Sequence, residues 1–208
     1  MSRRLLVAPL AASLAACGHM PVSTIWALRN FDAATLEPSA LRAAIRIPEM
    51  LEPQPRGVTL TVGWWRDGEE KAKHETKFVL RESTAPEDVA PLAGEKKPGA
   101  RIYVYRVDPA DYAEIRAIQK RSLEEKARNP GKTHGSFGVG ADACRRGELP
   151  EGALPTTTFL RTQPSGAYLT VLKDVDLRAA VTAEKPLDAL LPPCGKLTSR
   201  AEPIASAR

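Results

Sequence analysis

The sequence predicts an α+β fold: a single globular domain over residues 24–194, with a mainly antiparallel sheet of about six strands and two main helices. Three observations lead to this prediction. Several segments alternate between apolar and polar residues, as half-buried strands do, and most of them come in pairs joined by short turns. One long segment after Asp108 has helical spacing. The 208 residues, 43% of them hydrophobic, suffice for the core of one domain, and the sequence contains no internal repeat.

The first part of the domain is predicted to contain one strand and one short helix. Residues 24–31 alternate around Trp26 and Leu28, which favours a strand. Residues 37–45 favour a helix, because Pro38 suits a first turn and three apolar residues share one helical stripe: Leu41, Ala44 and Ile45. Three prolines then predict an irregular connector: Pro48, Pro53 and Pro55.

Residues 57–81 carry the clearest strand pattern in the chain. Before the Asp67-Gly68 pair, one face is apolar and consists of Val58, Leu60, Val62 and Trp64. A two-residue turn would place this face opposite lysines. A three-residue loop over residues 66–68 instead places Val62 opposite Ala72 and Leu60 opposite His74. We therefore predict the three-residue hairpin.

The middle of the chain is predicted to form a loop, a strand and the longest helix. Residues 83–99 contain three prolines and a charged cluster, which predicts a surface loop with little structure. Residues 101–107 favour a strand, with Ile102 and Val104 on one face and two tyrosines on the other. Asp108 as the cap and Pro109 at the first position then predict a helix that ends at residues 129–131.

The last part of the domain is predicted to be mostly strands. Residues 135–144 alternate and favour a strand, and residues 156–162 and 167–172 favour a second hairpin. Residues 178–190 predict a weak last helix. Residues 195–208 have no apolar pattern, and we expect a flexible C-terminal tail.

The N-terminus has the three-part layout of an export signal. Arg3 and Arg4 form a positive region, residues 5–14 are apolar, and Ala15 and Ala16 are the small residues that a signal peptidase requires. Ten apolar residues span only about 15 Å as a helix, roughly half the hydrocarbon thickness of a membrane. No later segment approaches the ~20 apolar residues that a spanning helix needs.

The end of this leader, Leu14-Ala15-Ala16-Cys17, resembles the lipobox of bacterial lipoproteins; the resemblance covers residues 1–18. It implies that residues 1–16 are cleaved and that Cys17 becomes the first residue and receives acyl chains. Residues 17–23 would then form a lipidated tether. Three acyl chains make a nearly permanent anchor, since one alone holds a protein only marginally. Gly18 in place of Asp implies the outer membrane, with the domain facing the periplasm.

Cysteine usage and charge agree with this location. An exported domain folds in an oxidising compartment, so Cys144 and Cys194 predict a disulfide, with two free buried thiols as the alternative. The net charge falls from +5 to +3 when Arg3 and Arg4 are removed. We expect no nucleic-acid partner, and the expected anionic partners are lipid head groups or an envelope polymer.

The sequence offers no catalytic, cofactor-binding or metal-binding constellation. His74 is predicted to be an ordinary sheet histidine. His134 lies near Ser136, but the chain has no nucleophile elbow and no identifiable acid partner. The histidines, cysteines and aspartates do not have metal-ligand spacing.

One surface is a candidate for contact with a partner. Adjacent strand residues point to opposite faces, so Trp65 lies either outside the sheet or beneath the second helix; burial beneath the helix is the favoured alternative. Three lysines follow it along the predicted hairpin and form a basic strip: Lys71, Lys73 and Lys77. Such strips usually discourage edge pairing, and as a contact surface this one suits an anionic envelope polymer or an envelope protein.

These observations predict a membrane-anchored envelope lipoprotein that acts as a non-enzymatic interaction or assembly module. Two alternatives stay open: an envelope hydrolase with a site assembled from distant residues, and a carrier of lipids or small ligands. An enzyme predicts a deep pocket that joins a histidine to a carboxylate, and a carrier predicts a long apolar cavity.

Overall fold

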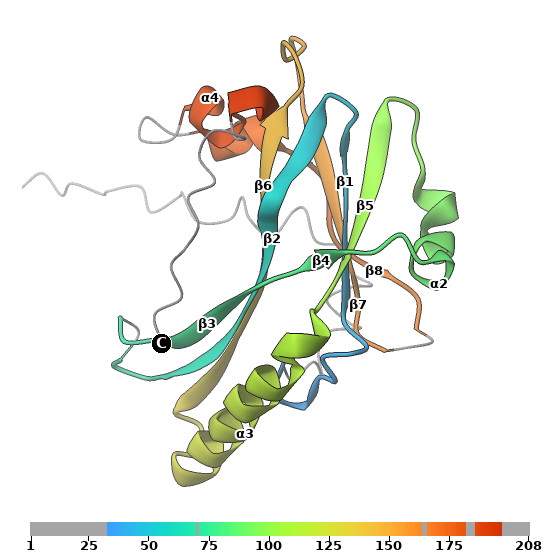
Figure 1. Ribbon diagram of the computed structural model, residues 1–208. Helices are drawn as coiled ribbons and strands as arrows, with labels where there is room; N and C mark the ends of the chain where they lie inside the picture. The colour runs from blue at the N-terminus through green and yellow to red at the C-terminus, as the bar shows by residue number, and fades with distance from the viewer. Residues whose placement is uncertain (1–32, 70, 164–165, 182–185, 197–208) are drawn as a thin grey trace, which may run out of the picture.

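The computed structural model describes residues 33–69, 71–163, 166–181 and 186–196, and these form an α+β fold with two antiparallel sheets (Figure 1). The larger sheet has the strand order β4-β5-β1-β7-β8, with bounds Arg81–Glu82, Ala100–Arg106, Arg42–Pro48, Pro155–Arg161 and Leu169–Asp176. The smaller sheet has the order β3-β2-β6, with bounds His74–Val79, Leu51–Arg66 and Thr133–Arg145. The predicted α+β class with antiparallel strands is confirmed.

Two helical segments account for most of the helix in the described residues. The first joins α2 (Pro86–Val89) to the 3-10 helix η3 (Ala90–Glu95), and the second joins η4 (Pro109–Asp111) to α3 (Tyr112–Arg128). The remaining segments are single turns: η2 (Ala33–Thr35), η5 (Leu177–Ala180), α4 (Leu187–Leu190) and η6 (Cys194–Lys196). Figure 1 shows α2 beside the larger sheet on the side away from the smaller one, and α3 at one end of the two sheets.

The inner face of the larger sheet packs against the smaller sheet. On this face Ala43 of β1 lies between Tyr105 of β5 and Leu160 of β7. They share one buried core with the apolar face of β2 and with α3, through Val58, Leu60, Val62, Ile115 and Ile118. The core thus consists of two sheets closed at one end by a helix, and its apolar pattern on β2 is the predicted one.

The outer face of the larger sheet is covered by α2 and η3. Ala44, Val104 and Phe159 are neighbours across β5, β1 and β7, and Leu92 of η3 packs on them. Because side chains alternate along these strands, the central strands β5, β1 and β7 have buried residues on both faces. The sequence predicts a surface loop over residues 83–99; this prediction is wrong, since the segment forms both helices of the cover.

Several predicted elements are confirmed. The strands over residues 101–107 and 135–144 correspond to β5 and β6, and the second hairpin corresponds to β7 and β8. Asp108 caps the long helical segment, since its Oδ1 accepts a hydrogen bond from the Ala110 N–H at 3.1 Å. Pro109 occupies the first helical position, and the segment ends at Asn129.

The predicted helix over residues 37–45 is wrong, because Arg42–Pro48 forms β1. The helical stripe was misleading: the apolar inner-face residues Ala43, Ile45 and Ile47 alternate with Arg42, Ala44 and Arg46 on the outer face. The two arginines look solvent-exposed in the sequence but are largely buried beside carboxylates. The strand alternation of β1 was therefore hidden in the sequence, because arginine side chains are usually exposed to solvent.

The irregular connector predicted from the prolines is also replaced by a strand. Strand β2 includes Pro53, and Pro53 faces Ala143 of β6; the pairing register shifts before it resumes at Val58. Arg56 in this bulge has a positive φ of 59°. The bulge accommodates the prolines, which lack an N–H for the ladder.

The first hairpin has a longer loop than predicted. Trp64 pairs with His74, and Leu60 pairs with Phe78, so the three-residue loop and its register are wrong. The predicted faces are nevertheless right, because the true register differs from the predicted one by an even number of residues. Strand β2 continues to Arg66 by pairing with Thr133 of β6, past the point where β3 begins.

The predicted last helix over residues 178–190 is wrong in extent: its described residues form the separate turns η5 and α4. The strand predicted over residues 24–31, the leader with Cys17 and the tail beyond Lys196 lie outside the described residues. Among the described residues, no helix is both long enough and apolar enough to cross a membrane.

Candidate functional site

The candidate site is an apolar cavity of about 350 Å³ between the two sheets. One wall comes from β1, β5, β7 and β8 of the larger sheet, and the opposite wall from β2 and β6 of the smaller sheet. Sixteen residues line it: Ala43, Ala44, Ile45, Val58, Tyr105, Phe137, Gly138, Val139, Ala141, Thr156, Thr158, Phe159, Leu160, Val171, Leu172 and Leu177. The volume falls in the range of about 300–1,000 Å³ that is usual for small-molecule sites.

The cavity lies where the sandwich has two open strand edges. In the described part of the chain, β8 pairs only with β7, and β6 pairs only with β2 apart from one bridge between Arg145 and Pro193. Helix α3 contributes Ile115 and Ile118 to the core between the sheets, but it contributes no residue to the cavity lining. No described strand or helix therefore closes the space between β6 and β8.

The cavity has an exposed apolar rim. Val139 of β6 is 41% exposed and Leu172 of β8 is 36% exposed, and both belong to the lining. They are two of the four large hydrophobic side chains that are exposed in the described residues; the others are Leu123 and Val181. Apolar side chains that remain in water beside a cavity are typical of a ligand-binding or interaction site.

None of the described residues that line the cavity is charged, and the polar side chains among them are one phenol and two hydroxyls. Burial raises the pKa of the Tyr105 phenol above its usual value, so this group stays uncharged at neutral pH. The Thr158 hydroxyl accepts a hydrogen bond from the Leu172 N–H at 3.2 Å, where the β7–β8 pairing is irregular. The Thr156 hydroxyl is buried and has no hydrogen-bond partner among the described residues. The cavity therefore suits an apolar molecule.

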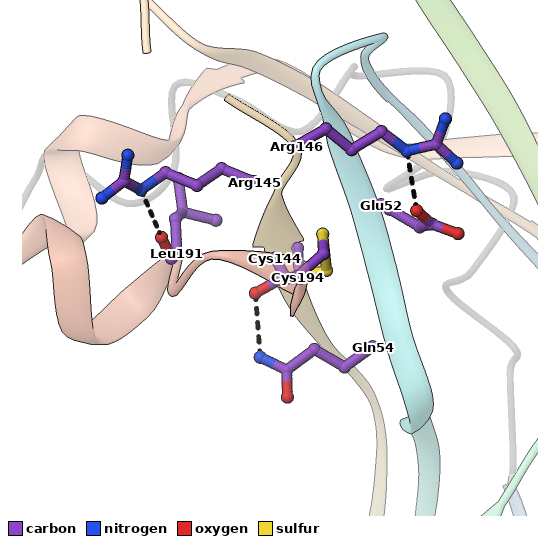
Figure 2. Close-up of a disulfide and its surroundings, with 8 residues drawn as sticks. Glu52, Gln54, Cys144, Arg145, Arg146, Leu191 and Cys194 are labelled. Atoms are coloured by element: carbon purple, nitrogen blue, oxygen red, sulfur yellow. Dashed lines mark hydrogen bonds and ion pairs between the residues drawn. A yellow bond between two sulfur atoms is a disulfide. The ribbon is translucent and has the colours of Figure 1, made fainter. Parts of the chain in front are cut away.

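The predicted disulfide is present at the end of the β6 wall. Cys144 of β6 is bonded to Cys194 of η6, which closes a sequence separation of 50 residues (Figure 2). The Arg145 N–H donates to the Pro192 carbonyl at 2.9 Å, and the Arg145 Nε donates to the Leu191 carbonyl at 3.1 Å. The bond and these contacts attach the C-terminal turns to β6. Leu191 of this segment belongs to a third buried cluster with Leu51 and Leu154.

The predicted contact residues lie elsewhere, on the smaller sheet and its connecting loop. Trp65 is half-buried on the outer face and stacks on His134, with ring centroids 4.3 Å apart. Burial beneath the second helix, the favoured alternative for Trp65, is wrong, since α3 packs with the residues of the inner face. Lys71, Lys73 and Lys77 are exposed, as the sequence indicates, but the Lys73 Nζ lies 3.8 Å from the Glu75 carboxylate.

His134 and Ser136 do not form the base and nucleophile of a hydrolase. The His134 Nε2 lies 2.7 Å from the Asp67 carboxylate, whereas the Ser136 hydroxyl donates to Glu75. Gly63 lies between Ser136 and Glu75 in the pairing of the three strands. Because the serine hydroxyl is bound to a carboxylate in place of the imidazole, the arrangement lacks the hydrogen bond that activates a serine nucleophile. His74 stacks on Trp64, with ring centroids 4.1 Å apart.

Two clusters of charged residues on the outer face of the larger sheet attach its cover. In the first, Asp88 of α2 is 1% exposed and accepts hydrogen bonds from Arg42, Arg161 and Ser83. Burial opposes the ionisation of Asp88, but these three donors outweigh it and hold the pKa of the carboxyl below its usual range.

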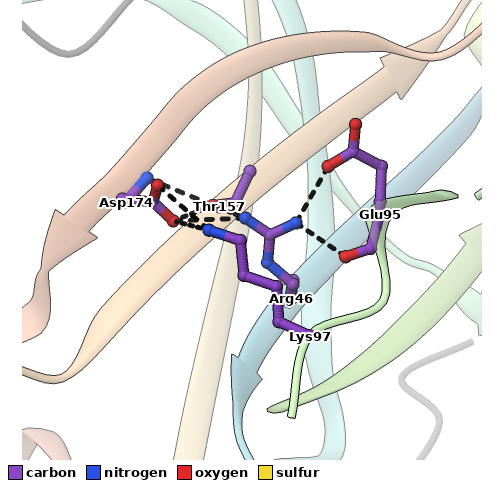
Figure 3. Close-up of polar contacts among 5 residues, drawn as sticks. All are labelled: Arg46, Glu95, Lys97, Thr157 and Asp174. Carbon is purple, nitrogen blue, oxygen red and sulfur yellow. Dashed lines mark hydrogen bonds and ion pairs between the residues drawn. The ribbon is translucent and has the colours of Figure 1, made fainter.

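The second cluster surrounds Arg46, which is 4% exposed (Figure 3). Its guanidinium donates to the Glu95 side chain at 2.9 Å, to the Thr157 hydroxyl at 2.9 Å and to the Asp174 carboxylate at 3.1 Å. Lys97 also contacts Asp174, at 3.2 Å. Burial disfavours the charged form of Asp174, and hydrogen bonds from Lys97, Thr157 and Arg46 more than compensate, so its pKa is lowered. Two cations and two carboxylates balance, which indicates a structural role.

Comparison of the chain with models of protein families, with curated proteins and with solved structures found no match. Within the described ranges, no group of three or more His, Cys, Asp or Glu residues could hold a metal ion.

The cavity could not be predicted from the sequence. Its apolar lining has the same strand alternation as the filled core, and the difference depends on which strand edges are left uncovered.

Proposed function

We propose that this protein is a membrane-tethered, non-enzymatic binding protein that takes up an apolar small molecule in the cavity between its sheets. The observation that carries the proposal is the uncharged lining of the cavity, together with the exposed rim at Val139 and Leu172. Transfer of each CH₂ group from water into such an environment contributes about 0.8 kcal/mol. Dry apolar cavities in proteins take up small hydrocarbons for the same reason.

The expected anchor supports a lipid-derived ligand. If Cys17 is acylated, 15 residues lie between the anchor and Ala33, where the described chain begins. A fully extended segment of this length reaches at most about 55 Å. Ala33 would then stay within this distance of a membrane surface, so the domain and its cavity would remain close to the main source of molecules with hydrocarbon chains. Mass spectrometry of the mature N-terminus tests the anchor: an unmodified cysteine, or cleavage at another position, would contradict it.

Titration with a fluorescent hydrocarbon probe tests the uptake. The full chain with Cys17→Ser is used, because this substitution prevents acylation and removes competing acyl chains. We expect saturable binding, and Val139→Glu should weaken it at least about tenfold, since a carboxylate at the rim must lose water when a ligand enters. Leu123→Glu is the matched control, because Leu123 is 42% exposed but lies on α3, away from the lining. Absence of binding, or equal loss in both variants, would refute the proposal.

A second candidate function is the contact with an anionic envelope polymer that the basic strip suggests. The half-buried Trp65 and the exposed Lys77 both belong to the outer face of the smaller sheet. Substitution of Lys71, Lys73 and Lys77 by Gln should then weaken binding to lipopolysaccharide. An equal charge change on α3, at Lys120, Arg121 and Arg128, should leave it unchanged. Equal effects of the two triple variants would exclude the strip as a specific site.

A further inference from the structure

The two edge strands beside the cavity differ in how they are protected from pairing with a further strand. Edge strands of natural sheets usually carry charged residues, prolines or bulges that prevent such pairing. Strand β8 has these devices: its register with β7 shifts twice, and it contains Lys173, Asp174 and Asp176. Residues 138–141 of β6 have none of them, because they are two glycines, a valine and an alanine in regular pairing with β2. Strand β6 is therefore the edge on which a further strand can pair.

The inner side of this edge requires an apolar neighbour. Val139 lies opposite the buried Leu60 of β2, so it faces the larger sheet, yet it is 41% exposed. Across the cavity, Leu172 of β8 is 36% exposed. Because alternate residues of a strand share a face, a strand added to β6 would direct every second side chain to the side on which Val139 lies. A matching strand therefore has large apolar residues at alternate positions.

The described chain begins beside this edge. The turn η2 lies against both α3 and β6, and the Gln119 side chain of α3 donates to the Ala33 carbonyl at 2.8 Å. Strand β6 begins at the same helix, since the Thr133 hydroxyl donates to the Glu125 carbonyl at 3.3 Å. A segment that precedes Ala33 and follows β6 therefore runs antiparallel to it, which is the orientation of the other pairs in this sheet.

Residues 24–31, which the sequence predicts to be a strand, have the pattern and the length that this edge requires. Trp26 and Leu28 occupy alternate positions, and Arg29 falls on the opposite face. Eight residues rise about 27 Å in a strand, and the seven residues 138–144 of the β6 edge extend over about 24 Å. Beyond this stretch the edge is taken by the C-terminal segment, through the bridge of Arg145 to Pro193.

We infer that residues 24–31 of the same chain are the partner of this edge: they pair antiparallel with β6 and place Trp26 and Leu28 over the mouth of the cavity. This inference goes beyond the proposed function and does not depend on it, because it concerns the sheet edge. A ligand would enter by displacing these two side chains from the mouth. If Cys17 is acylated, only residues 18–23 separate the anchor from this strand.

The first test measures how well Trp26 is shielded from acrylamide in the full chain with Cys17→Ser. The difference in emission between this protein and its Trp26→Phe variant isolates Trp26 from Trp64 and Trp65. We expect Trp26 to be quenched several-fold more weakly than free tryptophan, because the rim side chains would cover its ring. Quenching as strong as that of free tryptophan would overturn the inference.

A matched pair of substitutions tests which face of the segment is buried. Leu28→Glu places a carboxylate on the inner face, where it must lose water, and should expose Trp26 to acrylamide. It should also speed hydrogen exchange of the amides of residues 138–144, because a backbone N–H that loses its hydrogen bond exchanges faster. Arg29→Glu changes the charge by more but lies on the opposite face, so it should leave both measurements unchanged. Equal effects of the two variants, or no effect of Leu28→Glu, would contradict the pairing.

Crosslinking of paired cysteines tests the place where the segment lies. Leu28→Cys with Val139→Cys should react efficiently with a thiol crosslinker, and Leu28→Cys with Leu123→Cys should react poorly. Val139 and Leu123 are 41% and 42% exposed, so the two positions are equally accessible to the reagent. A segment that pairs with no edge would crosslink to both positions and would overturn the inference. Crosslinks between two chains would assign the strand to a second copy and would overturn the pairing within one chain.

The outcomes separate this inference from the proposed function. If Trp26 is shielded and the hydrocarbon probe does not bind, the pairing on β6 stands and the proposed function fails. If the probe binds saturably and Trp26 is as exposed as free tryptophan, the proposed function stands and the pairing fails.

Discussion

The two faces of the larger sheet are formed by the same strands but are closed in different ways. On the outer face, α2 and η3 lie over Ala44, Val104 and Phe159, and buried arginines bind carboxylates of the cover. On the inner face, α3 and the smaller sheet fill one part with core side chains, and between β6 and β8 the described residues leave a cavity.

This difference shows how each face can behave. The ion pairs and hydrogen bonds on the outer face require fixed partners, and displacing the cover would leave several charges buried without them. The exposed rim side chains of the cavity, Val139 and Leu172, are apolar and form no ion pairs that a guest would have to break. The outer face is therefore suited to holding the fold, and the open part of the inner face to binding.

The largest effect is expected from Asp88→Asn on the outer face. The substitution removes the negative charge that two buried arginines share, Arg42 and Arg161. Loss of one member of a buried ion pair typically costs on the order of 3–5 kcal/mol of unfolding free energy, measurable by urea denaturation. Asp188→Asn is the control, because the Asp188 side chain is 83% exposed in its pair with Arg145; an exposed pair contributes roughly 0–1 kcal/mol. Equal losses in the two variants would contradict the structural role of Asp88.

The same carboxylate makes stability depend on pH. The folded-state pKa of Asp88 is held below its unfolded value, so its contribution is fully present above the unfolded pKa of about 3.9. The contribution is lost as the pH falls through the lower, folded-state pKa. Stability of the wild-type protein should therefore decrease below about pH 4, and Asp88→Asn should flatten part of this decrease. An unchanged pH profile in the variant would exclude Asp88 as its source.

A loss of similar or slightly smaller size is expected when the disulfide beside the open flank is removed. The bond closes a 50-residue separation, for which the chain-entropy estimate is about 4 kcal/mol. Cys144→Ser with Cys194→Ser should lower the urea midpoint of unfolding and should also weaken hydrocarbon uptake, because β6 forms one wall of the cavity. Reductant should destabilise the wild-type protein but not the double variant; a response of the double variant would point to another cause.

A matched pair of truncations compares the filled and open parts of the inner face. Ile118 of α3 is 3% exposed, whereas Val139 at the cavity rim is 41% exposed. Ile118→Ala should cost about 2–4 kcal/mol through lost burial and the void that remains, and Val139→Ala should cost less than about 1 kcal/mol. Hydrocarbon binding should respond mainly to Val139→Ala. The reverse order of stabilities would mean that the cavity wall, and not the α3 contact, is the core of the fold.

Much of the fold was predictable from local patterns. Strands with strict alternation, such as the one containing Leu60 and Val62, were identified together with their buried faces. The helix after Asp108 was identified because a capping side chain and Pro109 act within a single turn. The disulfide followed from the expected compartment and an even pair of cysteines.

Two of the errors share a physical cause, which is that burial depends on partners distant in sequence. The helix over residues 37–45 was predicted from Pro38 and an apolar stripe, and the alternation of β1 was hidden because Arg42 and Arg46 are buried only beside Asp88 and Asp174. Residues 83–99 were predicted as a loop but form two helices, because their apolar side chains are buried against the outer face of the larger sheet. Neither set of contacts can be predicted from the residues of a single helix or strand, because the contacting residues lie far apart in the sequence.

The sequence by itself determined the α+β class, the apolar face of β2, the long helix and the pairing of Cys144 with Cys194. The address of the chain, an acylated Cys17 at the outer membrane, stays a prediction from the sequence. The tertiary structure alone decided that the strands divide into two sheets and that the described residues leave a cavity between β6 and β8. The reason is that alternation specifies which side chains leave water, but only the placement of strand edges decides whether other side chains or a ligand will cover them.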